Sequence, residues 1–174
     1  YAPEAHSATS QTLESTLSWT SDSPFSFATV AQAAWAVILS MRGRTSDPNK
    51  DVCFAATVSG RTAPLEGIED IVGPTITTTP VRLQFNLDDT VSGLLEHVHD
   101  QSLSMLPFEH FGLGRIREIS SSARDACASV NLLVVQPSQL ADGTLPLGLK
   151  RMVEEEAVDG LSEPFGLVME CSHN

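Results

Sequence analysis

The spacing of apolar residues along the chain predicts three helices with recognisable ends. Ser26 can cap the first helix, and the nearly continuous apolar residues from Ala28 to Leu39 predict that it is buried. A second helix is predicted after residues 88–90, any of which can cap it, because apolar residues then recur at helical spacing until Pro107. A short third helix is predicted over residues 113–119.

Four further segments predict strands. Residues 52–58 are apolar and β-branched, and residues 130–135 are almost continuously apolar, as in a strand covered on both faces. Residues 165–171 predict a last strand, and residues 75–85 alternate between apolar and polar positions. Pro80 cannot donate a ladder hydrogen bond, so this alternating strand lies at an edge or carries a bulge. Its predicted inward face carries Thr79, Val81, Leu83 and Phe85.

Strands that alternate with helices indicate a two-layer α/β or α+β sandwich. A chain of 174 residues fits one domain, and 41% hydrophobic with 18% charged residues is typical of a globular protein. Residues 1–25 are rich in Ser, Thr and Ala, which predicts a connector before a folded unit over residues 26–174. No apolar run approaches the ~20 residues that span a bilayer. We therefore expect a soluble unit excised from a longer protein.

The charge balance argues against nucleic acid as a partner. The formal net charge is −12, and the ten basic residues are scattered. Arg115, Arg117 and Arg124 form the one close group. A solvated helix face and a contact with a phosphate-bearing partner both fit this group.

The cysteines and histidines predict neither disulfides nor a metal site. Cys53, Cys127 and Cys171 are far apart and odd in number, which favours buried thiols in a reducing, cytosolic setting. His97 and His99 are two residues apart on a predicted helix, so they point to different sides and cannot share a metal.

Arg61, Asn131 and His110 are single polar residues in unusual contexts. Arg61 follows a Ser-Gly pair at a strand end and is either a surface residue or a bidentate anchor for a carboxylate from another lobe. Asn131 lies in an apolar strand, where its amide either bonds neighbouring backbone or faces a channel. His110 has neither a nucleophilic serine nor a paired carboxylate nearby, so we do not expect it to be catalytic.

A threonine ladder follows the long glycine- and proline-rich segment 60–74, whose length suggests a function. Its hydroxyls point to both faces of one strand, and they either support the strand or line a binding surface. The ladder consists of Thr75, Thr77, Thr78 and Thr79.

Several of these segments, in this order, resemble the C-terminal half of a nonribosomal peptide synthetase condensation domain, most like the fungal examples. The resemblance covers residues from about 29 to 171 and includes a departure, since Thr77 occupies a place where the family usually has asparagine. The matching segments are Thr29–Ser40, which contains Gln32–Trp35, and Asp51–Arg61, Ile71–Arg82, Leu106–Glu109 and Asn131–Leu132.

The resemblance implies a chloramphenicol-acetyltransferase-like lobe with a mixed sheet packed against helices. In this family two such lobes form a V around a tunnel, and the phosphopantetheine arms of two peptidyl carrier proteins enter it from opposite ends. The acceptor amine attacks the donor thioester beside a His-His-x-x-x-Asp-Gly motif on the N-terminal lobe. Arg61 would then pair with the aspartate of that motif, Asn131 and the threonine ladder would line the tunnel, and residues 62–74 would form part of its floor. Neither a metal nor a directly bound cofactor is implied.

The His-His-x-x-x-Asp-Gly motif does not occur in these 174 residues. We therefore expect residues 26–174 to be one lobe, incomplete at both ends and inactive alone. Three roles stay open for the whole domain. It forms peptide bonds or cyclises and releases a peptide, it epimerises an amino acid, or it serves as a non-catalytic docking lobe.

Overall fold

The computed structural model describes residues 13–16, 23–42, 47–62, 65–121, 123–124, 131–136 and 167–172. Most of the predicted connector over residues 1–25 lies outside these ranges, so the domain division stays a prediction. In chain order the elements are α1 (Phe27–Arg42), β1 (Asn49–Val58), η1 (Ile68–Asp70), β2 (Thr77–Asn86), α2 (Val91–Met105), η2 (Leu106–Phe111), α3 (Leu113–Ile119), β3 (Asn131–Gln136) and β4 (Leu167–Ser172).

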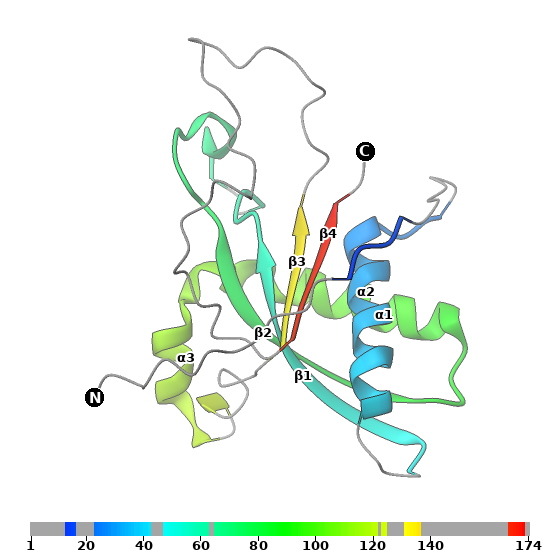
Figure 1. Cartoon of the computed structure of the whole chain (residues 1–174). Coiled ribbons are helices and arrows are strands. Elements are labelled where there is room, and N and C mark those ends of the chain that lie inside the picture. Colours follow the sequence, from blue (N-terminus) through cyan, green and yellow to red (C-terminus); the bar gives the residue numbers. More distant parts are fainter. Residues whose placement is uncertain are drawn as a thin grey trace.

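The four strands form one mixed sheet in the order β2-β1-β3-β4 (Figure 1). β1 pairs antiparallel with β2 in an unbroken register, while β3 runs parallel to both β1 and β4. Within the described part, β2 is therefore an edge strand, as Pro80 predicted. Pro80 lies opposite Ala55 without a bulge, so the edge position alone accommodates its missing N–H.

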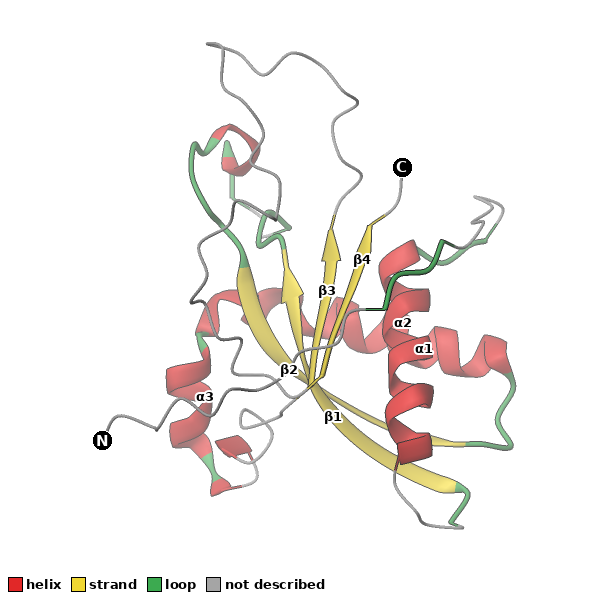
Figure 2. Cartoon of the chain, viewed as in Figure 1, coloured by secondary structure: helices red, strands yellow, loops and turns green. Residues whose placement is uncertain are grey.

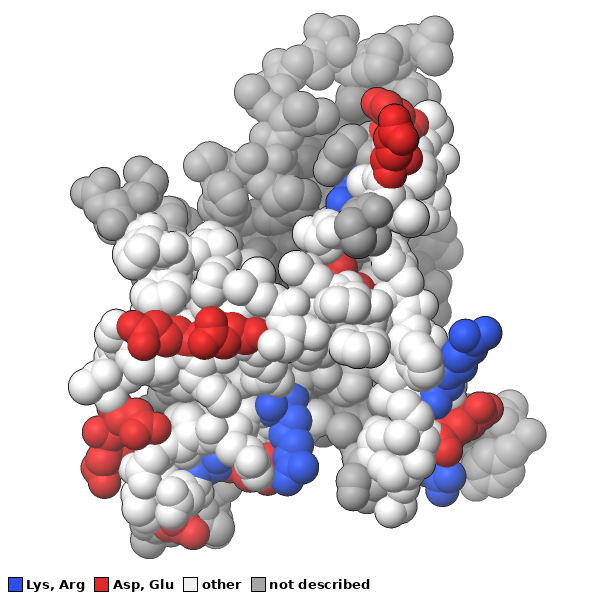
Figure 3. Space-filling view, turned by 180° about the vertical axis from the view of Figure 1, so that it is seen from behind, with Lys and Arg blue, Asp and Glu red and all other residues white. Residues whose placement is uncertain are grey.

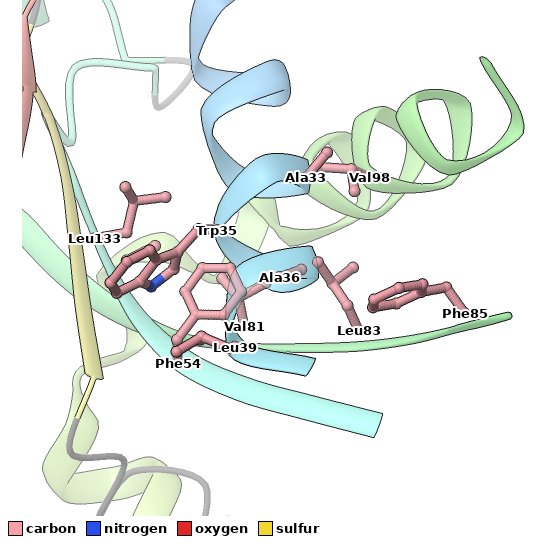
Figure 4. Packing of buried hydrophobic residues seen from close by; sticks show 11 residues of the cluster. Ala33, Trp35, Ala36, Leu39, Phe54, Val81, Leu83, Phe85, Val98 and Leu133 are labelled. Carbon is pink, nitrogen blue, oxygen red and sulfur yellow. The ribbon is translucent and has the colours of Figure 1, made fainter. Parts of the chain in front are cut away.

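Helices α1 and α2 pack on one face of this sheet and cross each other (Figure 1). The core between the layers is built around the fully buried side chains of Phe54, Leu83, Val98 and Leu133 (Figure 4). Trp35 of α1 lies among them. The alternating face predicted for β2 is confirmed, because its apolar positions and Thr79 are all buried.

Local sequence signals explain where the helices begin and end. The Ser26 hydroxyl accepts a hydrogen bond from the backbone N–H of Thr29 at 3.1 Å, and the Thr90 hydroxyl accepts one from Gly93 at 3.1 Å. Of the three capping candidates for α2, Thr90 is thus the cap. α2 ends before Pro107, as predicted, and α3 has its predicted bounds.

Two expectations from the apolar pattern differ from the structure. β1 begins at Asn49, three residues before the predicted strand, because the polar residues there pair with the end of β2. Val91 is the first of the apolar residues that recur at helical spacing in α2, yet it is 75% exposed. Val91 lies in the first turn of α2, where helical spacing alone does not ensure that another residue covers the side chain.

Cysteine environments correct the prediction of buried thiols. Cys53 and Cys171 are half-buried and neither forms a disulfide, while Cys127 lies outside the described residues. Burial, with a smaller contribution from the charge of Glu170, raises the pKa of the Cys171 thiol. The Cys171 thiol is therefore protonated at neutral pH.

The sheet face opposite the helices carries a charged cluster. Arg82 donates from Nε and Nη2 to the two carboxylate oxygens of Asp51, at 2.9 and 2.5 Å, and Gln84 donates to the same carboxylate at 3.0 Å. Both charged side chains are about half exposed, so solvent screens the pair. Figure 3 shows the face of the molecule seen from behind, where described basic side chains lie in separate groups beside acidic ones.

We expect this pair to give a small, pH-dependent contribution to stability. The hydrogen bond from Arg82 holds the pKa of Asp51 below its ordinary value of 3.8. The contribution should therefore be fully present above the unfolded-state pKa and be lost as the pH falls through the lower folded-state pKa. Denaturant titrations of wild type and Asp51→Asn at pH 7 and pH 2.5 measure it. A difference in stability that grows toward low pH would contradict this assignment.

Candidate functional site

Three of the segments singled out by sequence, residues 51–61, 71–82 and 106–109, meet where β1 ends, β2 begins and η2 lies beside β2. The connection between β1 and β2 extends beyond the end of the sheet and contains the short helix η1 (Figure 2). Among the described residues, no helix is long and apolar enough to cross a membrane. No group of three His, Cys, Asp or Glu side chains that could hold a metal occurs in the same ranges.

A close backbone approach at Gly60 organises this junction. Gly60 is buried and has a φ of +67°, in the left-handed region that favours glycine. A Cβ at this position would lie 2.0 Å from the backbone oxygen of Thr75 and 2.9 Å from Cε1 of His110. Because no side chain fits there, the two ends of the β1–β2 connection can lie against each other.

The guanidinium of Arg61 holds the middle of the same connection. Nη1 donates to the backbone oxygen of Ile68 at 2.8 Å, and Nη2 donates to those of Ile71 and Gly73 at 3.1 and 3.2 Å. The planar guanidinium, with its five N–H donors, suits several carbonyls that converge from one loop. Sequence reasoning missed this role, since it considered only a surface position or a carboxylate partner.

Glu109 and His110 attach η2 to the residues on either side of Arg61. The Thr62 hydroxyl donates to Oε2 of Glu109 at 2.5 Å. Nε2 of His110 lies 2.9 Å from the Gly60 carbonyl oxygen, and because that oxygen can only accept, Nε2 is the donor. The Glu109 side chain is 8% exposed, an unusual burial for a carboxylate. A glutamate two residues after the helix-ending proline was the available sequence signal.

Three members of the threonine ladder have a side-chain hydrogen-bond partner in the fold. Thr75 donates to the Ser59 carbonyl at 2.8 Å, and Thr77 donates to the Glu109 carbonyl at 3.0 Å. The Thr78 hydroxyl lies 3.1 Å from that of Thr57, on the sheet face away from the helices.

Thr79 lies on the helix-covered face and is buried. It lines a cavity of about 40 Å³ together with Glu109, Gln32 and Ser102. Both polar and apolar side chains line this cavity, and it is large enough for a water molecule. Asn131 is the first residue of β3, in register with Leu167, and its side chain lies outside the described set. A tunnel-lining role for Asn131 and the ladder stays a prediction.

The two other histidines in the described part of the chain lie away from this junction. His97 and His99 are on α2, and the His99 ring makes an edge contact with Phe25 at a centroid distance of 6.1 Å. Arg115, Arg117 and Arg124 are exposed, on α3 and just after it. The junction itself consists of side chains bonded to backbone carbonyls and to one another, an arrangement that fixes a loop in place.

Solved structures share this architecture. The crystal structure of CT aligns with a TM-score of 0.60 and 30% identity, over 75% of this chain and 30% of that one. The crystal structure of holo T3CT aligns with a TM-score of 0.56 and 31% identity, over 67% of this chain and 27% of that one. The fold is therefore an α/β lobe of the chloramphenicol-acetyltransferase type, with a mixed sheet packed against helices, as the sequence predicted.

Sequence comparison places the chain in a family. The family model described as Condensation domain matches residues 4–143, so the chain belongs to the condensation domain family. It is 40% identical over 152 residues to nonribosomal peptide synthetase GRA1 of Gibberella zeae, which covers 87% of this chain. It is also 42% identical over 130 residues to cyclochlorotine synthetase of Talaromyces islandicus, covering 74% of this chain. The chain spans about 2% of the length of each of these relatives.

Proposed function

We propose that this chain is the C-terminal lobe of a condensation domain that forms peptide bonds between carrier-bound thioesters. The observation that carries the proposal is the turn at Arg61, just after β1. The Arg61 guanidinium donates to three backbone carbonyls of the β1–β2 connection and so fixes that connection in place. The family resemblance assigns to this turn the contact with the catalytic motif of the other lobe. A turn with so many internal hydrogen bonds is suited to that task, because it presents a fixed surface.

The proposed reaction joins two acyl groups that carrier proteins deliver on phosphopantetheine arms. The acceptor amine attacks the donor thioester carbon, an amide bond forms, the carbon–sulfur bond breaks, and the amine proton leaves with the thiol as the net result. The second histidine of the motif on the N-terminal lobe would accept or position that proton. On this side, Arg61 would pair with the motif's aspartate, Asn131 and Thr75–Thr79 would line the tunnel, and the chain would bind no cofactor of its own.

Exposed apolar side chains on the connection support a partner lobe in contact with it. Val72 is fully exposed, and Leu65 and Ile76 are each more than 60% exposed. Arg61 anchors this same segment, so apolar surface is presented on a fixed loop. Apolar groups presented in this way are typical of an interface. The half-buried thiols fit the proposed cytoplasmic location.

Assays of the intact parent domain test the proposal. The sequence upstream of Tyr1 should encode the His-His-x-x-x-Asp-Gly motif, and the domain with L-loaded donor and acceptor carriers should yield an amide detected by mass spectrometry. This chain alone, and the intact domain with alanine at the motif's second histidine, are the matched controls and should yield none. Conversion of the donor residue to its D-isomer without an amide would instead indicate epimerisation. Carrier binding without either product would indicate a docking lobe.

A further inference from the structure

Two consecutive residues of η2 form hydrogen bonds with the residues on both sides of Arg61. His110 donates to the carbonyl of Gly60, and Glu109 accepts from the hydroxyl of Thr62. Thr62 and Glu109 are 47 positions apart in the sequence, and Gly60 and His110 are 50 apart. These contacts therefore connect η2, which is distant in the sequence, to the two residues on either side of Arg61.

We propose that Glu109 is a positioning residue for the reaction, and that it acts by fixing the turn that carries Arg61. This inference rests on the proposed function for Arg61. Glu109 accepts a hydrogen bond from Thr62, the residue after Arg61, so its effect on Arg61 passes through Thr62 and the backbone. The hydrogen bond from His110 holds Gly60, the residue before Arg61. Together, the contacts of His110 and Glu109 restrict rotation of the turn.

The burial of the Glu109 carboxylate supports its role as a positioning residue. Burying a carboxylate is costly unless it is hydrogen bonded, and the 8% exposed side chain of Glu109 accepts the short bond from Thr62. The backbone oxygen of Glu109 also accepts from the Thr77 hydroxyl, at the start of β2. One residue thus connects the end of β1 to the beginning of β2, the two ends of the connection that Arg61 holds in its middle.

Without this contact, the bonds that hold the turn would be those of residues 59 and 60 and those of the Arg61 guanidinium itself. The Arg61 N–H donates to the Ser59 hydroxyl at a long 3.4 Å, and Thr75 donates to the Ser59 carbonyl. Both bonds lie on the side of Arg61 that precedes it in the chain. The side that follows, at Thr62, is held by Glu109.

Substitutions in the intact condensation domain test this role. Glu109→Ala should lower kcat for amide formation about tenfold with little change in the KM for the carriers, because displacing a positioned group lowers the rate after binding. Glu109→Gln should retain most of the rate, since its amide oxygen still accepts from Thr62. Thr62→Val should reproduce the loss and Thr62→Ser should restore it. Glu118→Ala, on the exposed surface of α3, is the matched control.

A double substitution separates positioning from general destabilisation. If Glu109 acts through Arg61, Glu109→Ala should cause little further loss of kcat in an Arg61→Ala background. Multiplied losses would overturn the proposal. Thermal unfolding of each variant shows whether the fold survives at the assay temperature, and Glu109→Gln supplies the comparison if Glu109→Ala does not fold.

Hydrogen exchange tests the inference independently of the reaction. Amide protons of residues 60–73 should exchange faster in Glu109→Ala than in wild type, while those of α1 should not change. Unchanged protection over residues 60–73 would overturn the positioning role whether or not the domain makes amides. Faster exchange there, in a domain that makes no amide, would contradict the proposed function and support the contact between Glu109 and the turn.

Discussion

Replacing Gly60 with alanine should lower the free energy of unfolding by roughly 2–5 kcal/mol. The left-handed conformation at φ +67° costs a non-glycine residue about 1–2 kcal/mol. The added Cβ would also lie 2.0 Å from the Thr75 backbone oxygen, and relieving such an overlap costs about 1–3 kcal/mol. Because the obstacle is backbone, a side-chain rotation cannot remove it. Denaturant unfolding of the intact domain measures the loss.

Gly67→Ala is the matched control for this prediction. Gly67 also has a positive φ, of +78°, but a Cβ there would meet nothing within 4 Å. Its substitution should therefore cost only the conformational part, roughly 1–2 kcal/mol. Equal losses at the two glycines would show that the approach of Gly60 to Thr75 is not a tight constraint.

Arg61→Ala in the intact domain should lower the rate of amide formation about a hundredfold, because a misplaced site commonly loses that much. The variant loses three hydrogen bonds to the carbonyls of Ile68, Ile71 and Gly73, so the connection is released together with the proposed contact to the other lobe. Binding of the carrier proteins should change little, since no carrier contact is proposed for Arg61. Single-turnover rates and carrier affinities measure the two effects separately.

Two comparisons show whether this loss belongs to Arg61 specifically. Arg61→Lys should restore little activity, because one ammonium group cannot reach the carbonyls that the guanidinium fork spans. Arg42→Ala removes an equal charge from an exposed position at the end of α1 and should leave the rate unchanged. Normal turnover in Arg61→Ala would show that the proposed salt bridge to the catalytic motif is wrong.

The bounds of the elements could largely be predicted from sequence because they depend on neighbouring residues. The alternation that buries Val81, Leu83 and Phe85 follows from the two-residue period of a strand. The cap at Thr90 and the helix end before Pro107 depend on bonds within a few residues. The early start of β1 was missed because Asn49 and its neighbours are polar and gain their place by pairing with β2.

The site could be predicted only in part. Gly60, Arg61 and Glu109 lie in segments that the family resemblance marked, yet the bonds that they make were not foreseen. Arg61 binds backbone carbonyls, and every residue has a carbonyl, so no residue type in the sequence identifies them as partners. His110 was judged only as a catalytic residue, whereas its ring bonds the Gly60 carbonyl.

The sequence by itself determined the helices, the strands and the family of this protein, since each of these follows from residue types at short spacing or in a fixed order. The tertiary structure decided which of the marked residues meet. Glu109 reaches Thr62 across 47 positions because α2 returns η2 to the end of β1, and that return depends on packing against the sheet. Contacts of this kind arise from the arrangement of whole elements, which no local pattern specifies.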